Sequence, residues 1–444
     1  MLTLDLIRDC LEGAVPSAVA TCAADGTPNV TYVSQVHYVD PHHVALSFQF
    51  FNKTHENVRA NPHVHALVIH PTTAAQYQLE LQYLRTETSG PLFENMKAKL
   101  AGIASHTGMS GVFVLRGSDV YKVAGIEAVR AKTVPAVMPR RNLLSALRCC
   151  SNRLAEASDL ASLLDAALTG LEASFGIDHS MILMLDVAGK RLYTVASRGY
   201  RQSGVGSEIA IGCGVIGVAA QHRTPIRISH MTQEYSYSRA IRESVETAGL
   251  GGKLEIAIPF PGLQDPGSQL AAPILAAGRL FGVIYVESAE ELRFSYDDED
   301  ALVSFAAQLG TAMQALQHTA PPPEEDSEPA SPLPEAAGET VEIRHYAADD
   351  SVFIDDDYII KGVAGAIFRK LLRDSLRDHR TEFTNRELRL DSSLGLPDIT
   401  DNLEARLILL QRRLVERAAP IRIEKTGRGR FRLRVDRPFN LSEM

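Results

Sequence analysis

The stretch from Val44 to His70 combines local signals that only a few folds can satisfy together. Its first residues alternate apolar and polar side chains, which is the period-two pattern of a strand with two different faces. A turn over 52–54 leads into a short helical run. Asn61-Pro62 ends that run, because the residue before a proline is pushed out of the α region. Apolar alternation then resumes, so the stretch predicts strand, turn, short helix and strand.

Two polar side chains stand where the first of these strands meets the helix. A helix N-terminus presents unpaired backbone amides and the positive end of the helix dipole, and both favour anions. Lys53 adds a positive charge there, and Thr54 adds a hydroxyl donor. The turn is therefore predicted to hold a phosphate group.

The same pattern resembles the pyridoxamine 5′-phosphate oxidase-like family of flavin-binding split barrels, in which a strand, a Lys-Ser/Thr turn, a short helix and an Asn-Pro pair recur. The resemblance covers about residues 5–125 and includes Gly26-Thr27-Pro28. It implies a six-stranded barrel that dimerises and holds FMN at the dimer interface. The cofactor-binding residues that it implies are Ser34, Ser47, Gln49, Lys53, Thr54 and Gln82. Relatives of this family bind deazaflavin or haem instead, and some bind nothing.

Other segments of this region support a small barrel. Strands are predicted over 14–22, 30–39, 77–88 and 112–123, with a helix over 90–104. His63 and His65 lie two apart on a predicted strand and so share a face, which leaves haem as an alternative ligand. No cysteine or carboxylate cluster joins them, so packed or solvated histidines are favoured and no metal site is predicted.

The length of 444 residues exceeds one core and predicts about three domains at roughly 150 residues each. No apolar run approaches the roughly 20 residues that a membrane span needs, and the N-terminus lacks the pattern of a signal peptide. It is instead predicted to be an amphipathic helix packed on the barrel. Five cysteines without CxxC spacing argue against a disulfide framework. A cytoplasmic protein is expected.

A second domain is predicted after a proline-containing connector. Helices over 141–157 and 160–175 precede strands over 181–187, 191–197 and 208–211, and a glycine-rich run follows at 212–217. This run has GxGxxG spacing, but it lacks GK[ST] and a following acidic strand end, so it is weak evidence for a phosphate loop.

The order of these pieces resembles a GAF domain, a sensory module with an antiparallel sheet flanked by helices. Thr224-Pro225-Ile226-Arg227-Ile228, Gly282 to Glu287 and Phe294 to Glu299 belong to the match. The resemblance implies a ligand pocket beneath Ser229–Lys253. The pocket residues that it implies are Tyr235, Tyr237, Arg239 and Arg242. A cyclic nucleotide is disfavoured because the Asn-Lys pair of such domains is missing, and a GAF domain without ligand, used for dimerisation, is the alternative.

The end of the chain changes character. A run rich in Pro, Glu and Ala over 321–339 reads as an extended linker. The region from Arg412 to Arg437 then carries ten basic residues against three acidic ones, although the whole chain has a net charge of −9. A basic end on an acidic protein indicates a polyanionic partner.

The pattern of this last region resembles the winged-helix effector domain of OmpR-type response regulators. Helices are predicted over 359–379, from Thr384 with a capping box to Glu387, and over 401–416, and a β-hairpin follows around 426–429. DNA-binding residues implied by this resemblance are Arg406, Arg412, Arg413, Lys425, Arg428 and Arg430. Acidic residues at the start of the third helix repel phosphates, so a helix–wing unit for protein contacts is the alternative.

The predicted fold class is therefore multidomain α+β: a split β-barrel, a GAF domain and a winged helix. The predicted segments are 1–125 for the barrel, 126–142 for a connector, 143–317 for the GAF domain, 318–341 for the linker and 342–444 for the output domain. Two functions follow. The favoured one is a homodimeric sensor that reports to DNA. The alternative is an FMN-dependent oxidoreductase with a regulatory GAF domain, and it is less favoured because no acid–base pair accompanies the flavin motif.

Overall fold

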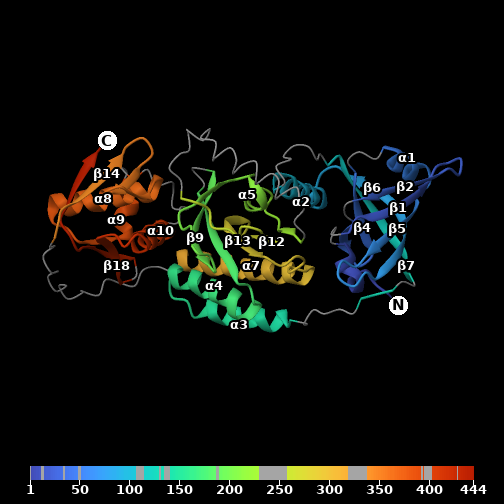
Figure 1. The fold of residues 1–444 in the computed structure, drawn as a ribbon, viewed down its shortest axis with the longest axis horizontal. Helices are drawn as coiled ribbons and strands as arrows, with labels where there is room; N and C mark the ends of the chain where they lie inside the picture. The colour runs from blue at the N-terminus through green and yellow to red at the C-terminus, as the bar shows by residue number, and fades with distance from the viewer. Residues whose placement is uncertain are drawn as a thin grey trace.

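Three domains follow one another along the long axis of the molecule (Figure 1). This computed structural model describes residues 2–11, 15–33, 36–48, 52–106, 115–129, 132–134, 141–186, 190–229, 258–318, 338–391, 394, 403–427 and 429–444. The N-terminal domain lies at one end, the central domain in the middle and the C-terminal domain at the other end.

The N-terminal domain is built on one antiparallel sheet. Its elements are η1 (Leu4–Leu11), β1 (Ser17–Cys22), β2 (Pro28–Val33), β3 (Val36–Asp40), β4 (His43–Phe48), α1 (Asn52–Ala60), β5 (His63–Ile69), β6 (Gln76–Glu87), α2 (Pro91–His106) and β7 (Gly117–Val129). The strand order is β2-β1-β5-β6-β7-β4-β3. Leu4, Ile7 and Leu11 of η1 are buried in the core of this sheet. The predicted N-terminal amphipathic segment is thus confirmed, as a 3₁₀ rather than an α-helix.

The described residues form seven strands, not the six that the family resemblance implies. The run predicted as one strand over 30–39 is divided between β2 and β3, which lie at opposite edges of the sheet. Of the region predicted as a closing strand pair over 112–123, residues 117–123 belong to one long strand, β7, which continues to Val129 and pairs with β6 over most of its length. The predicted order around α1 is confirmed, with β4 before the helix and β5 directly after Asn61-Pro62.

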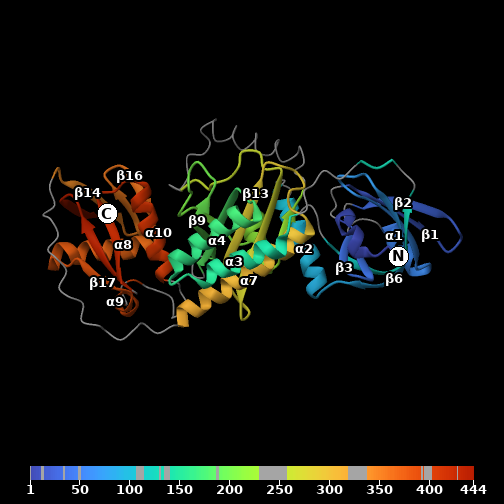
Figure 2. The ribbon, with the colours of Figure 1, turned by 90° about the horizontal axis from the view of Figure 1, so that it is seen from below.

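The central domain packs helices on both faces of a six-stranded sheet (Figure 1), and Figure 2 looks onto the face that the longer helices cover. Its elements are α3 (Leu143–Ala155), α4 (Leu160–Phe175), β8 (His179–Asp186), β9 (Arg191–Arg198), β10 (Glu208–Ala210), α5 (Gly214–His222), β11 (Ile226–Ile228), β12 (Ser268–Ala276), β13 (Arg279–Ser288) and α7 (Tyr296–His318). The strand order is β10-β9-β8-β13-β12-β11. Helices α4 and α7 contribute to the core on one face, and α5 contributes to the core on the other.

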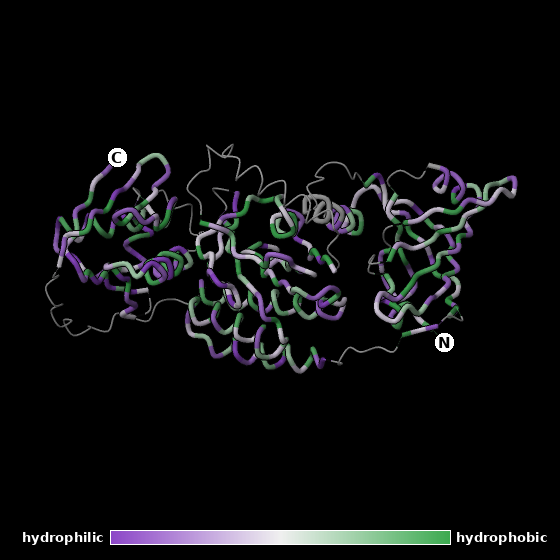
Figure 3. Tube along the Cα trace, viewed as in Figure 1, coloured by the Kyte–Doolittle hydropathy of each residue, from purple (hydrophilic) through white to green (hydrophobic). Residues whose placement is uncertain are grey.

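Burial on both faces explains the composition of the middle strands. Nearly every residue of β12 and β13 is buried, and these strands are largely apolar along the chain (Figure 3). The long helices instead alternate apolar and polar residues, because only one side of each meets the sheet.

The glycine-rich run before α5 has a packing role. A Cβ atom on Gly217 would lie 2.3 Å from the carbonyl oxygen of Ala210, so only glycine lets α5 approach β10 this closely. Gly212 has φ of +85°, a conformation that favours glycine. These requirements account for the GxGxxG spacing without a phosphate ligand.

The C-terminal domain has two sheets and three helices among its described residues. Its elements are β14 (Val341–Tyr346), β15 (Ser351–Ile354), β16 (Asp357–Ile360), α8 (Gly362–Asp378), β17 (Glu382–Thr384), α9 (Asn385–Leu390), α10 (Leu403–Glu416), β18 (Ile421–Gly427), β19 (Arg430–Val435) and β20 (Phe439–Glu443). The sheet orders are β16-β15-β14-β20 and β17-β19-β18.

Several predictions for this domain are confirmed and one boundary is wrong. The capping box joins Thr384 and Glu387, and β18 and β19 form the predicted hairpin. The helix predicted over 359–379 begins only at Gly362, because 359–360 complete β16 and pair with β15. The four strands of the sheet β16-β15-β14-β20 and strand β17 were not predicted. Strands β14 and β20 lie at the two ends of the domain's sequence and pair in parallel, a long-range contact that local alternation does not reveal.

A buried ionic cluster joins the N-terminal and central domains. Glu299 in the first turn of α7 lies 2.8 Å from Nε of Arg227 on β11 and 3.6 Å from Nζ of Lys99 on α2. All three side chains are at most 10% exposed. The Tyr296 ring lies 4.3 Å from the Arg227 guanidinium, and its hydroxyl donates to the carbonyl oxygen of Leu11.

The environment of this cluster fixes its charges. Burial alone would raise the pKa of Glu299, but Lys99 and Arg227 outweigh it and lower that pKa to about 2. His37 on β3 also faces the cluster and is buried. Burial, and then the positive charge of Lys99, lower the pKa of His37 to about 3, with smaller effects from Glu299, Arg227 and Arg8. His37 is therefore neutral and Glu299 charged in the folded protein at neutral pH.

We expect Glu299→Gln to lower the free energy of unfolding by about 3 kcal/mol, because it leaves two buried cations without their carboxylate. The measurement is the urea midpoint at unchanged m-value. Asp300→Asn is the matched control. Asp300 is the next residue of α7 and pairs with Arg8, but its side chain is 59% exposed, so the expected loss is below about 1 kcal/mol. Equal losses in the two variants would contradict this assignment.

A second prediction concerns pH. Because the folded-state pKa of His37 is about 3 and its ordinary value is 6.5, the unfolded chain binds the additional proton between these values. The titration of His37 therefore leaves the free energy of unfolding unchanged above pH 6.5. As the pH falls from 6.5 towards 3, it lowers that free energy at a slope of up to about 1.4 kcal/mol per pH unit. His37→Gln should reduce the pH dependence of the urea midpoint in this window, whereas His42→Gln at an exposed turn should not.

Candidate functional site

The two residues of the predicted phosphate cradle point in different directions from the first turn of α1. Lys53 is exposed. Thr54 is only 9% exposed, and its hydroxyl accepts a hydrogen bond from Nδ2 of Asn29 at 3.1 Å. One turn later, Asn57 donates from Nδ2 to the hydroxyl of Thr21, also at 3.1 Å. Thr54 and Asn57 thus hold α1 on the β1–β2 hairpin, and Lys53 is the residue presented to an anion.

The side chains in the first turn of α1 suit an anion, and the charge of Lys53 also acts on the exposed carboxylate of Asp25 in the β1–β2 turn. The first turn of α1 contains Lys53 and His55 and no acidic residue, and the last turn contains Arg59. The dipole of a helix is strongest at its first turn, and here no carboxylate side chain of that turn neutralises it. The residues present therefore fit a phosphate at the cradle, with Lys53 and the first amides of α1 as its donors.

Of the other predicted cofactor residues, Gln82 and Ser47 lie on strands of the sheet. Gln82 is exposed on β6, opposite His63 of β5 and Lys122 of β7. Ser47 lies on β4 beside Ser118, two residues after Ala45, whose side chain packs in the cluster formed with α2. Ser34 and Gln49 lie outside the described residues.

A polar chain in the same domain was missed by the sequence analysis. His55 Nδ1 lies 3.2 Å from Oδ2 of Asp119 on β7, and the His55 ring stacks on Phe48 at 4.2 Å. The other Asp119 oxygen accepts from the hydroxyl of Thr86, which itself lies 2.7 Å from the hydroxyl of Tyr83. Asp119 is buried and thus orients the imidazole. His55 was visible in the sequence, but its partner is 64 residues away.

The histidines considered for haem lie at the surface. His63 and His65 are exposed on β5, and His65 Nδ1 accepts from Nε2 of Gln78. Within the part of the chain that the structure describes, no group of three His, Cys, Asp or Glu side chains could hold a metal ion.

The predicted pocket residues of the central domain, Tyr235, Tyr237, Arg239 and Arg242, lie outside the described residues. The α5 side of the sheet carries a buried carboxylate that was not assigned a role from the sequence. Glu287 accepts from the amide of Leu263 at 2.8 Å and from the hydroxyl of Tyr285 at 3.0 Å. Burial raises the pKa of Glu287 despite these donors. The sequence feature that could have indicated this buried carboxylate is the position of Glu287 near the end of an otherwise apolar strand.

Four of the six basic residues predicted to meet DNA are engaged within the chain. Arg406, Arg412 and Lys425 pair with carboxylates of the central domain. Arg413 is 2% exposed and donates to the carbonyl oxygen of Ile359 and to Glu416, so it is an internal residue of the domain and has no surface to offer a phosphate. Arg430 is half-buried. Arg428 lies outside the described residues.

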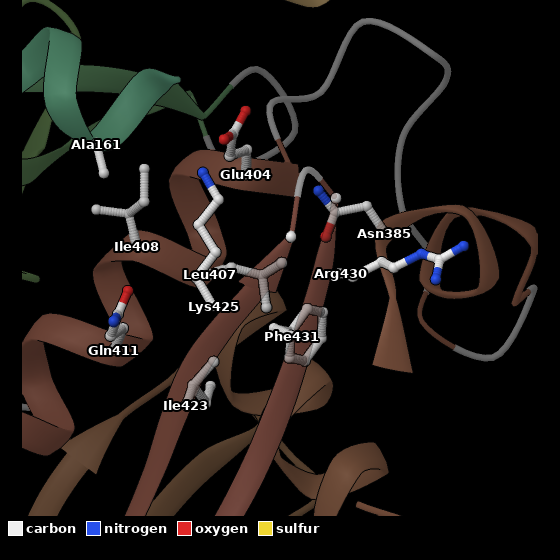
Figure 4. Close-up of a pocket in the computed structure, with 12 residues that line it drawn as sticks. Ala161, Asn385, Glu404, Leu407, Ile408, Gln411, Ile423, Lys425, Arg430 and Phe431 are labelled. Atoms are coloured by element: carbon white, nitrogen blue, oxygen red, sulfur yellow. The ribbon is translucent and has the colours of Figure 1, made fainter. Parts of the chain in front are cut away.

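A small cleft lies where the β18–β19 hairpin, α10 and α4 meet (Figure 4). Its volume is about 60 Å³. Leu407, Ile408, Ile423 and Phe431 give it an apolar floor, and polar side chains lie at its rim. Figure 4 shows Lys425 reaching from β18 along α10, with Ala161 of α4 across from Ile408. The contact between α4 of the central domain and the C-terminal domain therefore leaves a small gap at the hairpin.

Two family models match this chain. The pyridoxamine 5′-phosphate oxidase model matches residues 3–122, and the GAF domain model matches residues 159–313. The chain contains one domain of each kind. The pyridoxamine 5′-phosphate oxidase-like domain is the N-terminal β domain, and the GAF domain is the central one. No curated protein matches the chain.

Three solved structures illustrate what parts of the chain are similar to. The GAF domain of the Acinetobacter phosphoenolpyruvate-protein phosphotransferase is 19% identical, covers 41% of this chain and 99% of its own, and has a TM-score of 0.32. Free methionine-R-sulfoxide reductase from Neisseria meningitidis is 16% identical, with 41% and 97% covered and a TM-score of 0.31. An FMN-binding protein from Syntrophomonas wolfei subsp. wolfei is 16% identical, with 29% and 92% covered and a TM-score of 0.24.

Among the described helices, none combines the length and the apolar character that crossing a membrane requires.

Proposed function

We propose that this protein is a flavin-binding sensor in which a split barrel binds FMN, a GAF domain relays its state and a winged-helix domain acts on DNA. The observation that carries the flavin part is the exposed Lys53 at the acid-free start of α1, in a domain that the pyridoxamine 5′-phosphate oxidase family matches. Lys53 would hold the phosphate of FMN, and FMN would supply a reversible redox state.

A second copy of the chain would complete this site. Val30 and Tyr32 are 68% and 69% exposed, and both lie on the edge strand β2. An exposed apolar pair on an unpaired edge favours association with another subunit. Lys53 and Gln82 are also exposed, which is expected of residues that complete a shared site between subunits.

The barrel and the GAF domain are positioned to influence each other. Helix α2 of the barrel domain packs on α5 and β11 of the GAF domain. Asn95 donates to the hydroxyl of Thr224 at 2.5 Å, and Lys99 reaches Glu299. A displacement of α2 would therefore act directly on the GAF domain.

The element order of the C-terminal domain supports the DNA-binding part of the proposal. From α8 to β19 the chain runs helix, strand, helix, helix and hairpin, and β17 joins the hairpin in one antiparallel sheet. This is the order of a winged helix, in which α10 would be the helix presented to DNA.

The flavin proposal is tested with two ligands that differ by one phosphate. We expect Lys53→Ala to weaken FMN binding about tenfold or more and to leave riboflavin binding unchanged, because only FMN has the charge that Lys53 meets. Flavin fluorescence titration measures both affinities. Arg59→Ala, at the opposite end of α1, is the control. Absence of FMN binding by the wild type would refute the proposal, as would equal losses for both ligands.

One observation favours the second candidate, an FMN-dependent oxidoreductase. Asp119 orients His55, and the two form the kind of pair that can move a proton near α1. On this reading, His55→Gln should slow flavin turnover with a reduced nicotinamide by a larger factor than it weakens FMN binding. A turnover that is absent in the wild type, or unchanged by the substitution, would exclude this candidate.

A further inference from the structure

One face of α10 is covered by the GAF domain. Arg406 is 5% exposed, and its Nη2 lies 3.1 Å from Oδ1 of Asp186 on β8. Its guanidinium carbon also lies 4.2 Å from the centre of the Tyr193 ring on β9. This arginine is thus held by a carboxylate and an aromatic face of another domain.

The contact continues along the helix and onto the hairpin. Arg412, nearly two turns after Arg406, donates to the carbonyl oxygen of Val195 at 2.9 Å and to Oδ1 of Asp165 on α4 at 2.7 Å. Lys425 on β18 pairs with Asp159, the N-cap residue of α4. Three cations from two elements of the C-terminal domain therefore meet three aspartates of the GAF domain.

In the ion pairs of this interface, the cations lie on the C-terminal domain and the carboxylates lie on the GAF domain. A fourth pair, Lys361 with Glu208 of β10 at 3.6 Å, again places the cation on the C-terminal domain and the carboxylate on the GAF domain. Glu416 of the C-terminal domain also reaches the GAF domain, where it accepts from the hydroxyl of Ser203 and not from a cation. A surface that offers carboxylates to arginines and lysines presents the same chemistry as a row of phosphates.

We propose that Asp159, Asp165 and Asp186 of the GAF domain stand in for nucleic-acid phosphates, so that the GAF domain and DNA compete for the same face of α10. This inference rests on the proposed DNA-binding function. Three of the six residues implied for DNA contact, Arg406, Arg412 and Lys425, are held by the GAF domain. Arg406 is 5% exposed, so DNA can reach it only when the domains separate.

Features of the interface allow that separation. The side chains of Asp165 and Lys425 are 66% and 46% exposed, so water and salt reach these pairs. The cleft of about 60 Å³ between α4, α10 and the hairpin leaves the packing incomplete. The apparent association constant for DNA is then the intrinsic association constant multiplied by the fraction of molecules in which α10 is undocked.

The test uses the full chain and a short mixed-sequence double-stranded DNA. Asp165→Asn together with Asp186→Asn removes two GAF carboxylates and keeps Asp159, which caps α4. We expect this variant to bind DNA about tenfold more tightly than the wild type by fluorescence anisotropy. Backbone amides of α10 should also exchange faster with deuterium in the free variant.

The control is the pair Glu172→Gln and Asp300→Asn, which changes the net charge equally but removes carboxylates that pair elsewhere. It should match the wild type in both measurements. Equal DNA affinity of wild type and Asp165/Asp186 variant would overturn the competition and leave DNA binding intact. Faster α10 exchange without any DNA binding would overturn both proposals, and unchanged exchange would show that these aspartates do not hold α10.

Discussion

The pairing of Glu299 is the constraint on which the arrangement of the first two domains depends. A carboxylate this deeply buried is tolerated only when cations replace its water, and its two partners come from different domains: Arg227 from the GAF domain and Lys99 from α2 of the barrel domain. The domains must therefore lie together for the charges to be satisfied. Tyr296 adds to this junction by packing against Arg227 and by donating to Leu11, so η1 of the barrel domain is held there as well.

The opposite side of the GAF domain uses charge differently. Its pairs with α10 and the hairpin are in part open to water, and a small cleft remains between the surfaces. A buried pair costs several kcal/mol to break, whereas exposed pairs contribute about 1 kcal/mol or less and weaken with salt. The GAF domain thus meets the barrel domain through an ionic cluster that is buried throughout, and it meets the C-terminal domain through the buried Arg406–Asp186 pair flanked by pairs that water reaches. The buried apolar residues of the GAF and C-terminal domains also form one continuous cluster.

The turn at the start of α1 shows how one local motif can contain residues with two different roles. The turn Asn52-Lys53-Thr54 was identified from local pattern, and α1 does begin there. Consecutive helix residues point about 100° apart, so Lys53 faces outward when Thr54 faces the β1–β2 hairpin. Thr54 fixes the helix to the hairpin because Asn29 of β2 donates a hydrogen bond to its hydroxyl. The oriented His55–Asp119 pair was invisible for the same reason, since β7 returns to α1 only in the folded sheet.

The sequence by itself determined the features that rest on neighbouring residues. The capping box of Thr384 and Glu387, the hairpin after α10 and the helix over 160–175 were all predicted, because caps, turns and helical periodicity act within a few residues. Only the tertiary structure decided the pairing of β14 with β20 and the partners of Glu299, Arg406 and Arg412. The acids and bases could be counted in the sequence. Which of them meet depends on how separate domains pack, and burial then gives some of these pairs far more weight than others.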